Sequence, residues 1–197
     1  MPATVPTTVP TTTNLGQILD RNAAFAATDA RHNAPALPFL PRLGLYLLTC
    51  IDCRVDPADI LGIELGEALV QRNIGGRVTP AVLADIAYAS YLVESKAPDG
   101  PWFEVAIIHH TDCGSALLAD DELRRGYAQR IGVDERSLAD TAVLDPAKTV
   151  ATDVDKVLHS SAIPDSVAVS GHVYDVATGL VRTVVGATLA RSRAGRS

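Results

Sequence analysis

Short apolar runs alternate along the chain with strong helix-start signals, and this order limits the possible folds more than any other feature. The runs cover residues 43–50, 68–72 and 103–109, and each predicts a strand. The run at 43–50 lacks the every-second-residue polarity of a half-exposed strand, so it predicts a strand that is buried on both faces, and 103–109 predicts a further buried strand. Helix starts are indicated where an N-cap residue precedes proline, at Asp56-Pro57, Thr79-Pro80 and Asp145-Pro146. Strands that alternate with helices predict an α/β fold with a mostly parallel central sheet flanked by helices.

The end of the chain predicts a change in strand direction. We expect strands at residues 167–174 and 180–185, joined by a turn signal at 177–179. Such a hairpin adds an antiparallel edge strand at the C-terminal end of the sheet. The helices that we expect before it run from residue 57 and over residues 81–94, 120–130 and 146–159.

One domain with an N-terminal arm fits the length of 197 residues. Residues 1–13 are rich in Pro and Thr and predict a flexible tail. Residues 14–42 predict a helical arm, with a helix over about 15–27, followed by a proline-containing loop. We expect a single α/β domain over residues 43–190 and a basic tail over 191–197.

Composition argues against several classes of function. The net charge of −6 argues against nucleic acid as a partner, because phosphate binding needs a basic surface. The longest apolar runs, such as 43–50, are far shorter than the ~18 residues of a membrane span, so we expect no membrane partner. The start of the chain shows no signal-peptide pattern, and the odd count of 3 cysteines does not suit a disulfide framework. These observations predict a reducing, cytoplasmic setting, where cysteine clusters bind metal or perform chemistry.

All three cysteines follow predicted buried strands. Cys50 and Cys53 follow the first strand in the segment T-C-I-D-C-R, and Cys113 follows the third in H-H-T-D-C-G. Because the carboxyl ends of parallel strands meet at one edge of a sheet, the two segments should lie close together. Cysteine and histidine are the ligands that Zn²⁺ prefers, usually four groups in number.

Four interpretations of these residues stay open at this point. Cys50, His110 and Cys113 could hold a catalytic zinc with a fourth position left for water or for Asp52. Cys53 could instead complete a closed structural zinc site. Cys50 and Cys53 could form a redox pair, or the cysteines could be small buried apolar residues at strand ends.

The same segments resemble the β-class carbonic anhydrases over roughly residues 40–186. The resemblance rests on C-x-D-x-R at Cys50, Asp52 and Arg54, followed by H-x-x-C at His110 and Cys113. It extends to L-G-x-x-L-G-E-A from Leu61, R-N-x-G-G from Arg72, and G-H-V-Y-D-V-x-T-G from Gly171.

The resemblance implies that zinc is bound by Cys50, His110 and Cys113. It selects His110 over His109, and strand geometry agrees that only one of two neighbours faces the metal. It also implies an obligate homodimer or higher homo-oligomer. Cys53 departs from the family pattern, which usually has a small residue there, and we expect it to be inert or near the ligands without binding the metal.

Asp52 and Arg54 are implied to form a charged pair beside the metal. Two thiolates cancel the formal charge of Zn²⁺, so the metal needs help to acidify water. Asp52 could orient zinc-bound water, or it could be the fourth ligand of a closed, inactive state. A guanidinium–carboxylate pair with Arg54 would hold Asp52 off the metal. Gly114 is a candidate substrate-binding position, because it lets backbone approach the site.

The predicted function is zinc-dependent, reversible hydration of CO₂ to bicarbonate and a proton. A carbonyl sulfide or carbon disulfide hydrolase is the alternative, since these enzymes share the zinc motif and their substrates are also linear. A third possibility is a non-catalytic structural or sensor protein with a closed zinc site.

Overall fold

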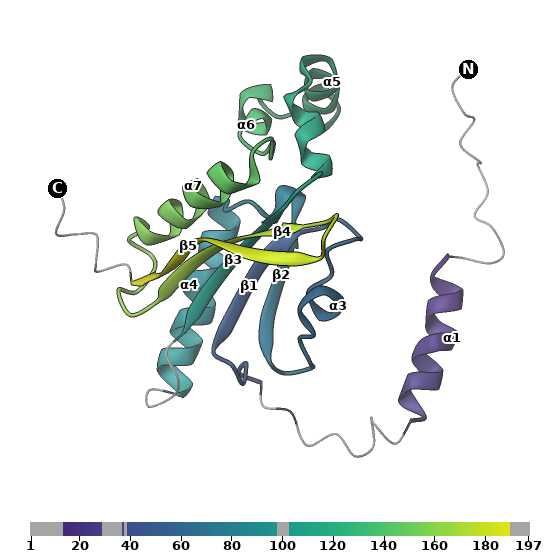
Figure 1. Ribbon diagram of the computed structural model, residues 1–197, viewed down its shortest axis with the longest axis vertical. Helices are drawn as coiled ribbons and strands as arrows, with labels where there is room; N and C mark the ends of the chain where they lie inside the picture. The colour runs from purple at the N-terminus through teal and green to yellow at the C-terminus, as the bar shows by residue number, and fades with distance from the viewer. Residues whose placement is uncertain (1–13, 29–36, 38, 98–102, 190–197) are drawn as a thin grey trace. The chain divides into compact units, whose positions relative to one another are not determined.

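The structure is a computed structural model that describes residues 14–28, 37, 39–97 and 103–189 (Figure 1). The tails predicted at residues 1–13 and 191–197 lie outside the described residues, as does most of the predicted loop before residue 42. The described chain divides into two units at residue 37, and each is considered by itself. The first unit contains helix α1 (Asn14–Ala26), which confirms the helix predicted for the arm.

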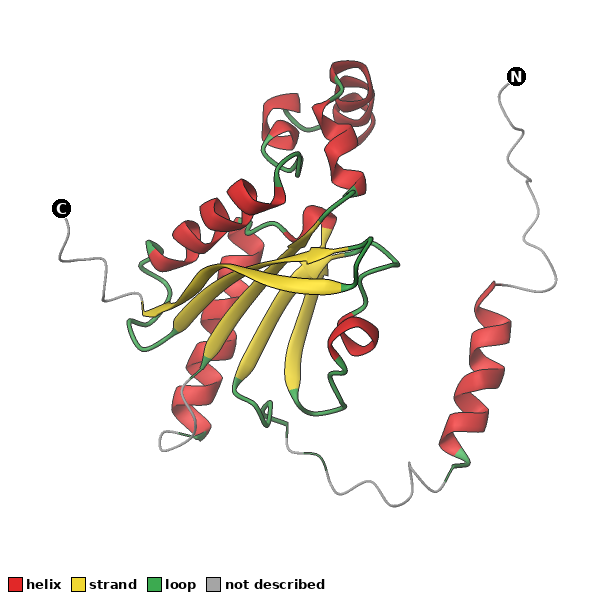
Figure 2. Cartoon of the chain, in the orientation of Figure 1, coloured by secondary structure: helices red, strands yellow, loops and turns green. Residues whose placement is uncertain are grey.

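The second unit is built on a five-stranded sheet with the order β2-β1-β3-β4-β5. Its strands are β1 (Leu45–Cys50), β2 (Ala68–Asn73), β3 (Glu104–His110), β4 (Ala168–Asp175) and β5 (Leu180–Leu189). The first four are parallel and β5 is antiparallel to β4, which confirms the predicted α/β fold and its antiparallel edge (Figure 2). Because Thr49 pairs with Ile108, the carboxyl ends of β1 and β3 lie side by side.

Helices join the strands, and α3, α4 and α7 begin where the capping signals predicted them. They are α3 (Pro57–Leu61), α4 (Pro80–Lys96), α5 (Asp121–Ile131), α6 (Glu135–Ala139) and α7 (Pro146–Leu158), with 3₁₀ turns η1 (Ile74–Gly76) and η2 (Gly114–Ala119). Each predicted cap accepts a backbone hydrogen bond, as Asp56 does from Ala58 and Asp145 does from Ala147 and Lys148. The sequence did not predict η2 and α6, which lie in the long connection between β3 and β4 and are too short to show clear periodicity.

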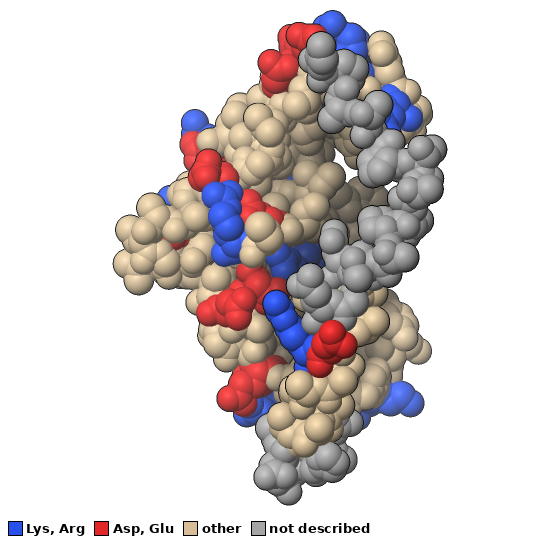
Figure 3. All heavy atoms as spheres, turned by 90° about the vertical axis from the view of Figure 1, so that its right-hand side faces the viewer, with Lys and Arg blue, Asp and Glu red and all other residues tan. Residues whose placement is uncertain are grey.

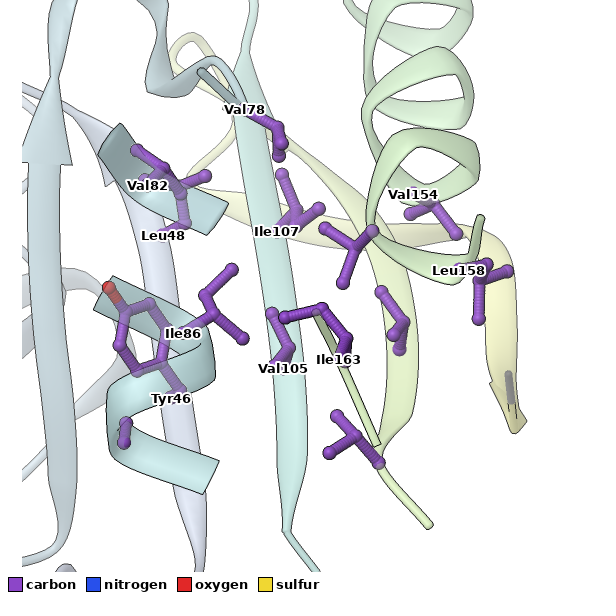
Figure 4. Close-up of a cluster of buried hydrophobic side chains, with 14 of the residues drawn as sticks. Tyr46, Leu48, Val78, Val82, Ile86, Val105, Ile107, Val154, Leu158 and Ile163 are labelled. Atoms are coloured by element: carbon purple, nitrogen blue, oxygen red, sulfur yellow. The ribbon is translucent and has the colours of Figure 1, made fainter. Parts of the chain in front are cut away.

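The two faces of the sheet are covered differently. On one face, α4 and α7 pack against β1 and β3, and Ile86, Val154 and Leu48 are fully buried there (Figure 4). The alternate side chains, among them Leu47 and Ile108, point to the other face. That second cluster is smaller and contains Cys50 and Cys113 together with the loop residue Val55. The partly buried side chains of Ile60 and Ile63 pack against this cluster.

Charges of both signs are mixed on the face of the molecule shown in Figure 3. Lys and Arg side chains are interspersed there with Asp and Glu rather than gathered by sign. Among the described residues, no helix is long and apolar enough to cross a membrane.

The turn after β2 packs closely against the end of β1. Gly76 has a left-handed backbone with φ +65°, and a Cβ on it would lie 3.0 Å from the Thr49 carbonyl carbon and 3.1 Å from the Cys50 nitrogen. These neighbours are backbone atoms and cannot move aside. Glycine at this position therefore allows η1 to support the strand end that carries Cys50.

We expect Gly76→Ala to destabilise the fold more than Gly62→Ala. Both glycines have positive φ, but a Cβ at Gly62 would meet nothing within 4 Å. Gly62→Ala should cost roughly 1–2 kcal/mol for the left-handed backbone, and Gly76→Ala roughly 1–3 kcal/mol more for the backbone overlap. Urea denaturation of both variants measures the difference, and equal losses would show that the close approach at Gly76 is unimportant.

Candidate metal centre

Three candidate ligands meet at the carboxyl edge of the sheet. Cys50 ends β1, His110 ends β3, and Cys113 directly precedes η2. All three residues are buried, and one ligand atom from each lies within 4.8 Å of the others. The Cys50 and Cys113 sulfurs are 3.8 Å apart. The predicted ligands are thus brought together by parallel pairing of β1 and β3.

The two adjacent histidines point to opposite faces of the sheet. His109 faces α7, where its Nδ1 lies 2.8 Å from Thr149 Oγ1. His110 points to the cysteines, and its Nδ1 lies 2.9 Å from the Thr111 carbonyl oxygen. A carbonyl oxygen only accepts hydrogen bonds, so the proton of a neutral His110 ring is on Nδ1. His110 Nε2 is buried and has no hydrogen-bond partner among the described residues, which leaves its lone pair free to bind a cation.

The two thiols share a hydrogen bond that shifts their pKa values in opposite directions. The hydrogen bond with Cys113, together with burial, raises the pKa of Cys50 to about 12. The hydrogen bond with Cys50 and those from Ser115 lower the pKa of Cys113 to about 6. Cys113 is therefore the more acidic of the two thiols. Two sulfurs and an unpartnered imidazole nitrogen form a donor set that fits a soft divalent cation such as Zn²⁺.

Asp52 and Arg54 form the expected ion pair beside these ligands. Asp52 Oδ1 accepts from Arg54 Nε at 3.0 Å, and Asp52 Oδ2 accepts from Arg54 Nη2 at 2.7 Å. The hydrogen bonds from Arg54 outweigh burial and hold the pKa of Asp52 well below its usual range. Asp52 Oδ2 lies 4.0 Å from His110 Nε2, so a permanent carboxylate adjoins the ligand set.

Asp112 is a second partner of Arg54 that sequence reasoning missed. Arg54 Nη1 donates to Asp112 Oδ2 at 2.7 Å, and Nη2 donates to the Asp112 carbonyl oxygen at 2.8 Å. Asp112 adopts φ +53°, a left-handed conformation that Asp tolerates better than most residues. Arg54 thereby links the loop after β1 to the loop after β3. The aspartate inside H-H-T-D-C-G was visible in the sequence, but its pairing was not.

Arg72 is a second missed residue, and it fixes the loop after β1. Its guanidinium donates to the Cys50 carbonyl at 2.9 Å, to the Asp52 carbonyl at 2.6 Å and to Asp56 Oδ2 at 2.7 Å. The segment R-N-x-G-G marked this arginine, but two of its three targets are backbone carbonyls, which no sequence pattern reveals.

A cavity of about 300 Å³ opens beside the candidate ligands. Its lining is mostly apolar and consists of Cys50, Ile51, Asp52, Ile74, Gly75, Gly114, Ser115, Leu117, Leu118, Leu123 and Tyr127. Gly114 thus lies in the cavity wall, although a Cβ on it would meet nothing within 4 Å, so space alone does not require glycine there. The cavity can hold a small neutral molecule next to the ligand set.

Cys53 lies outside the cluster of candidate ligands. Its side chain is exposed, whereas Cys50 and Cys113 are buried, and all three cysteines are free. The candidate cluster of Cys50, His110 and Cys113 does not include it. This arrangement does not favour the closed four-ligand site with Cys53 or the redox pair with Cys50.

On the face of the sheet that packs against α7, a buried ion pair joins Arg77, which directly follows η1, to Asp153 of α7. Arg77 Nε donates to Asp153 Oδ2 at 2.6 Å, and the Val78 N–H and Lys156 Nζ also donate to this carboxylate, at 3.1 and 2.8 Å. His109 Nε2 is 3.4 Å from Asp153 Oδ2. Burial raises the pKa of Asp153, but the hydrogen bonds from His109, Arg77 and Lys156 outweigh it and hold that pKa well below its usual range.

Comparisons with known proteins point to one family. A family model described as carbonic anhydrase matches residues 45–130. The chain is 29% identical to Beta-carbonic anhydrase 1 of Mycobacterium tuberculosis over 148 residues, which cover 75% of this chain and 86% of that protein. It is 26% identical to a carbon disulfide hydrolase of an Acidianus species over 161 residues, which cover 70% of this chain and 76% of that protein.

Solved structures give the same result. The chain resembles the crystal structure of a carbonic anhydrase from Streptococcus mutans with a TM-score of 0.71 and 31% sequence identity. The match covers 89% of this chain and 99% of that one.

We expect Asp153→Asn to destabilise the fold by about 3–5 kcal/mol at neutral pH, because it leaves the Arg77 charge buried without a counter-charge. Since the folded-state pKa of Asp153 is depressed, its stabilisation is complete above the ordinary Asp pKa of ~3.9 and declines as the pH falls below it. The difference in free energy of unfolding between the native chain and the variant should therefore become smaller at acidic pH. Urea denaturation from neutral to acidic pH measures this difference. Glu135→Gln is the control, because its pair with Arg125 is exposed on both sides and worth little. A difference below 1 kcal/mol, or one that does not change with pH, would contradict this role.

Proposed function

Because this chain belongs to the β-carbonic anhydrase family, we propose that it is a zinc enzyme that hydrates CO₂ to bicarbonate and a proton. The observation that carries the proposal is the unpartnered, buried His110 Nε2 beside two cysteine sulfurs. One of these cysteines, Cys50, lines an apolar cavity. Cys50, His110 and Cys113 are the proposed ligands. Zinc held there would supply a hydroxide nucleophile at neutral pH.

Asp52 is the proposed catalytic group of the chain itself. Its carboxylate lies 4.0 Å from the ligand nitrogen of His110, and it lines the cavity. From this position it can accept a hydrogen bond from the attacking oxygen and so orient that oxygen toward the substrate. Since the pKa of Asp52 is held well below its usual range, the carboxylate is an acceptor at every physiological pH.

Arg54 keeps Asp52 in this position. Its guanidinium bonds both Asp52 oxygens and is itself anchored on Asp112 across the site. Movement of Asp52 into the fourth metal position would break these bonds, so we propose that Arg54 opposes the closed, inactive state. The apolar lining of the cavity favours a neutral substrate over a charged one. Gly114, the proposed substrate-binding position, is part of this lining, which supports CO₂ binding there.

Carbon disulfide hydrolysis is the second candidate, because the chain is 26% identical to a carbon disulfide hydrolase. CO₂, carbonyl sulfide and CS₂ are all linear and neutral, so the same apolar wall suits each of them. We also propose that the chain works as a homodimer or higher homo-oligomer, as the family resemblance implies. We propose a cytoplasmic setting for it, which the odd count of 3 cysteines favours.

Replacing Asp52 with Asn tests the reaction and the role of the carboxylate together. We expect zinc to remain bound while CO₂ hydration falls by roughly 10–100-fold, because the acceptor that orients the nucleophile is weakened. Stopped-flow CO₂ hydration at alkaline pH measures this, and H₂S release from CS₂ is followed on the same samples. Full CO₂ turnover in Asp52→Asn would remove the carboxylate from the mechanism, and CS₂ turnover without CO₂ turnover would select the alternative.

Replacing Cys113 with Ser tests the ligand assignment. Zinc binding should be lost, because a serine hydroxyl is a poor ligand for this cation. Cys53→Ser is the matched control and should keep one zinc per chain. Elemental analysis of dialysed protein measures both variants, and stoichiometric zinc in Cys113→Ser, or its loss in Cys53→Ser, would show the assignment to be wrong.

A further inference from the structure

Ser115 is a buried hydroxyl in direct contact with one candidate ligand. It is only 6% exposed and lies in η2, two residues after Cys113. Its Oγ is 3.1 Å from the Cys113 sulfur. The same oxygen accepts a hydrogen bond from the Val143 N–H at 3.2 Å. The function derived so far does not use this residue.

The surroundings of the hydroxyl leave its proton available to the sulfur. A serine hydroxyl has one proton to donate and two lone pairs that accept. The Val143 N–H uses one lone pair, and a Cys113 thiolate, which has no proton of its own, would accept the hydroxyl proton. On its third side the oxygen is packed against Gly75, where an added Cβ would lie 3.0 Å from it.

We propose that Ser115 is a positioning residue that donates a hydrogen bond to the Cys113 thiolate, and thereby sets how strongly this sulfur binds the metal. This inference rests on the proposed metal site. A hydrogen bond fixes the direction of the sulfur lone pairs and withdraws charge from them. In a site with two thiolate ligands, less charge reaches the metal, which stays a stronger Lewis acid.

A purely structural role for Ser115 makes a different prediction. Loss of the Ser115 hydroxyl would also leave the Val143 N–H buried without a partner, and this would lower the stability of the fold without acting on the metal. Two variants separate the roles. Ser115→Thr keeps a hydroxyl at the same position. Ser90→Ala removes another buried hydroxyl, which donates to the Ile86 carbonyl at 2.8 Å in α4, away from the metal centre.

The experiment measures metal binding without any substrate. Zinc affinity is obtained by competition with a chromophoric chelator, and the thiolate-to-metal charge-transfer band is recorded on Co²⁺-substituted protein. We expect Ser115→Ala to weaken zinc binding by roughly 10–100-fold, as losses of such outer hydrogen bonds do. The lost orientation of the sulfur lone pairs should outweigh the charge that the sulfur regains. The band should move to longer wavelength, because sulfur electrons without the hydrogen bond are held less tightly. Ser115→Thr should restore both properties, and Ser90→Ala should leave both unchanged.

The outcomes distinguish this inference from the proposed function. Native affinity and an unshifted band in folded Ser115→Ala would overturn the role of Ser115, as would equal changes in Ser90→Ala or failure of Ser115→Thr to restore them. A native chain that binds zinc but turns over neither CO₂ nor CS₂ would overturn the proposed function, while the comparison of Ser115→Ala with the native chain would still decide the inference.

Discussion

The parallel pairing of β1 with β3 is the constraint on which the rest of the site depends. Thr49 opposite Ile108 places Cys50 and His110 at the same edge of the sheet, although 60 positions of sequence separate Cys50 from His110. Side-chain alternation along β3 then sends His110 to the cysteines and His109 to α7. A shift of one residue in this register would exchange the two histidines and dismantle the donor set.

Arginines give the loops around this edge their shape. Arg72 binds the carbonyls of Cys50 and Asp52, while Arg54 joins Asp52 to Asp112 across the site. On the opposite face, Arg77 and Asp153 join the turn after β2 to α7. Loops carry the functional groups, and loops alone are poorly ordered. Charged side chains that bind backbone carbonyls and carboxylates supply the order that regular hydrogen bonding does not.

Much of the fold could be predicted from the sequence, because its signals are local. Apolar runs indicated β1 and β3, and the Asp-Pro and Thr-Pro pairs indicated α3, α4 and α7. The prediction ended the last strand at residue 185, but β5 continues to Leu189, because β4 offers it pairing partners as far as Ala168. The 3₁₀ turn η2 and helix α6 were missed, since their form depends on packing against neighbours rather than on a repeating pattern.

The sequence by itself determined which chemistry is available: two cysteines, a histidine and an Asp-x-Arg pair, each following a buried strand. These follow from residue type and from periodicity over a few neighbours. Only the tertiary structure decided that Cys53 is exposed and outside the cluster, that Asp112 and Arg72 hold the loops, and that Ser115 touches the Cys113 sulfur. Such contacts depend on backbone direction and on elements distant in the chain, and both are fixed only when the sheet and its helices pack together.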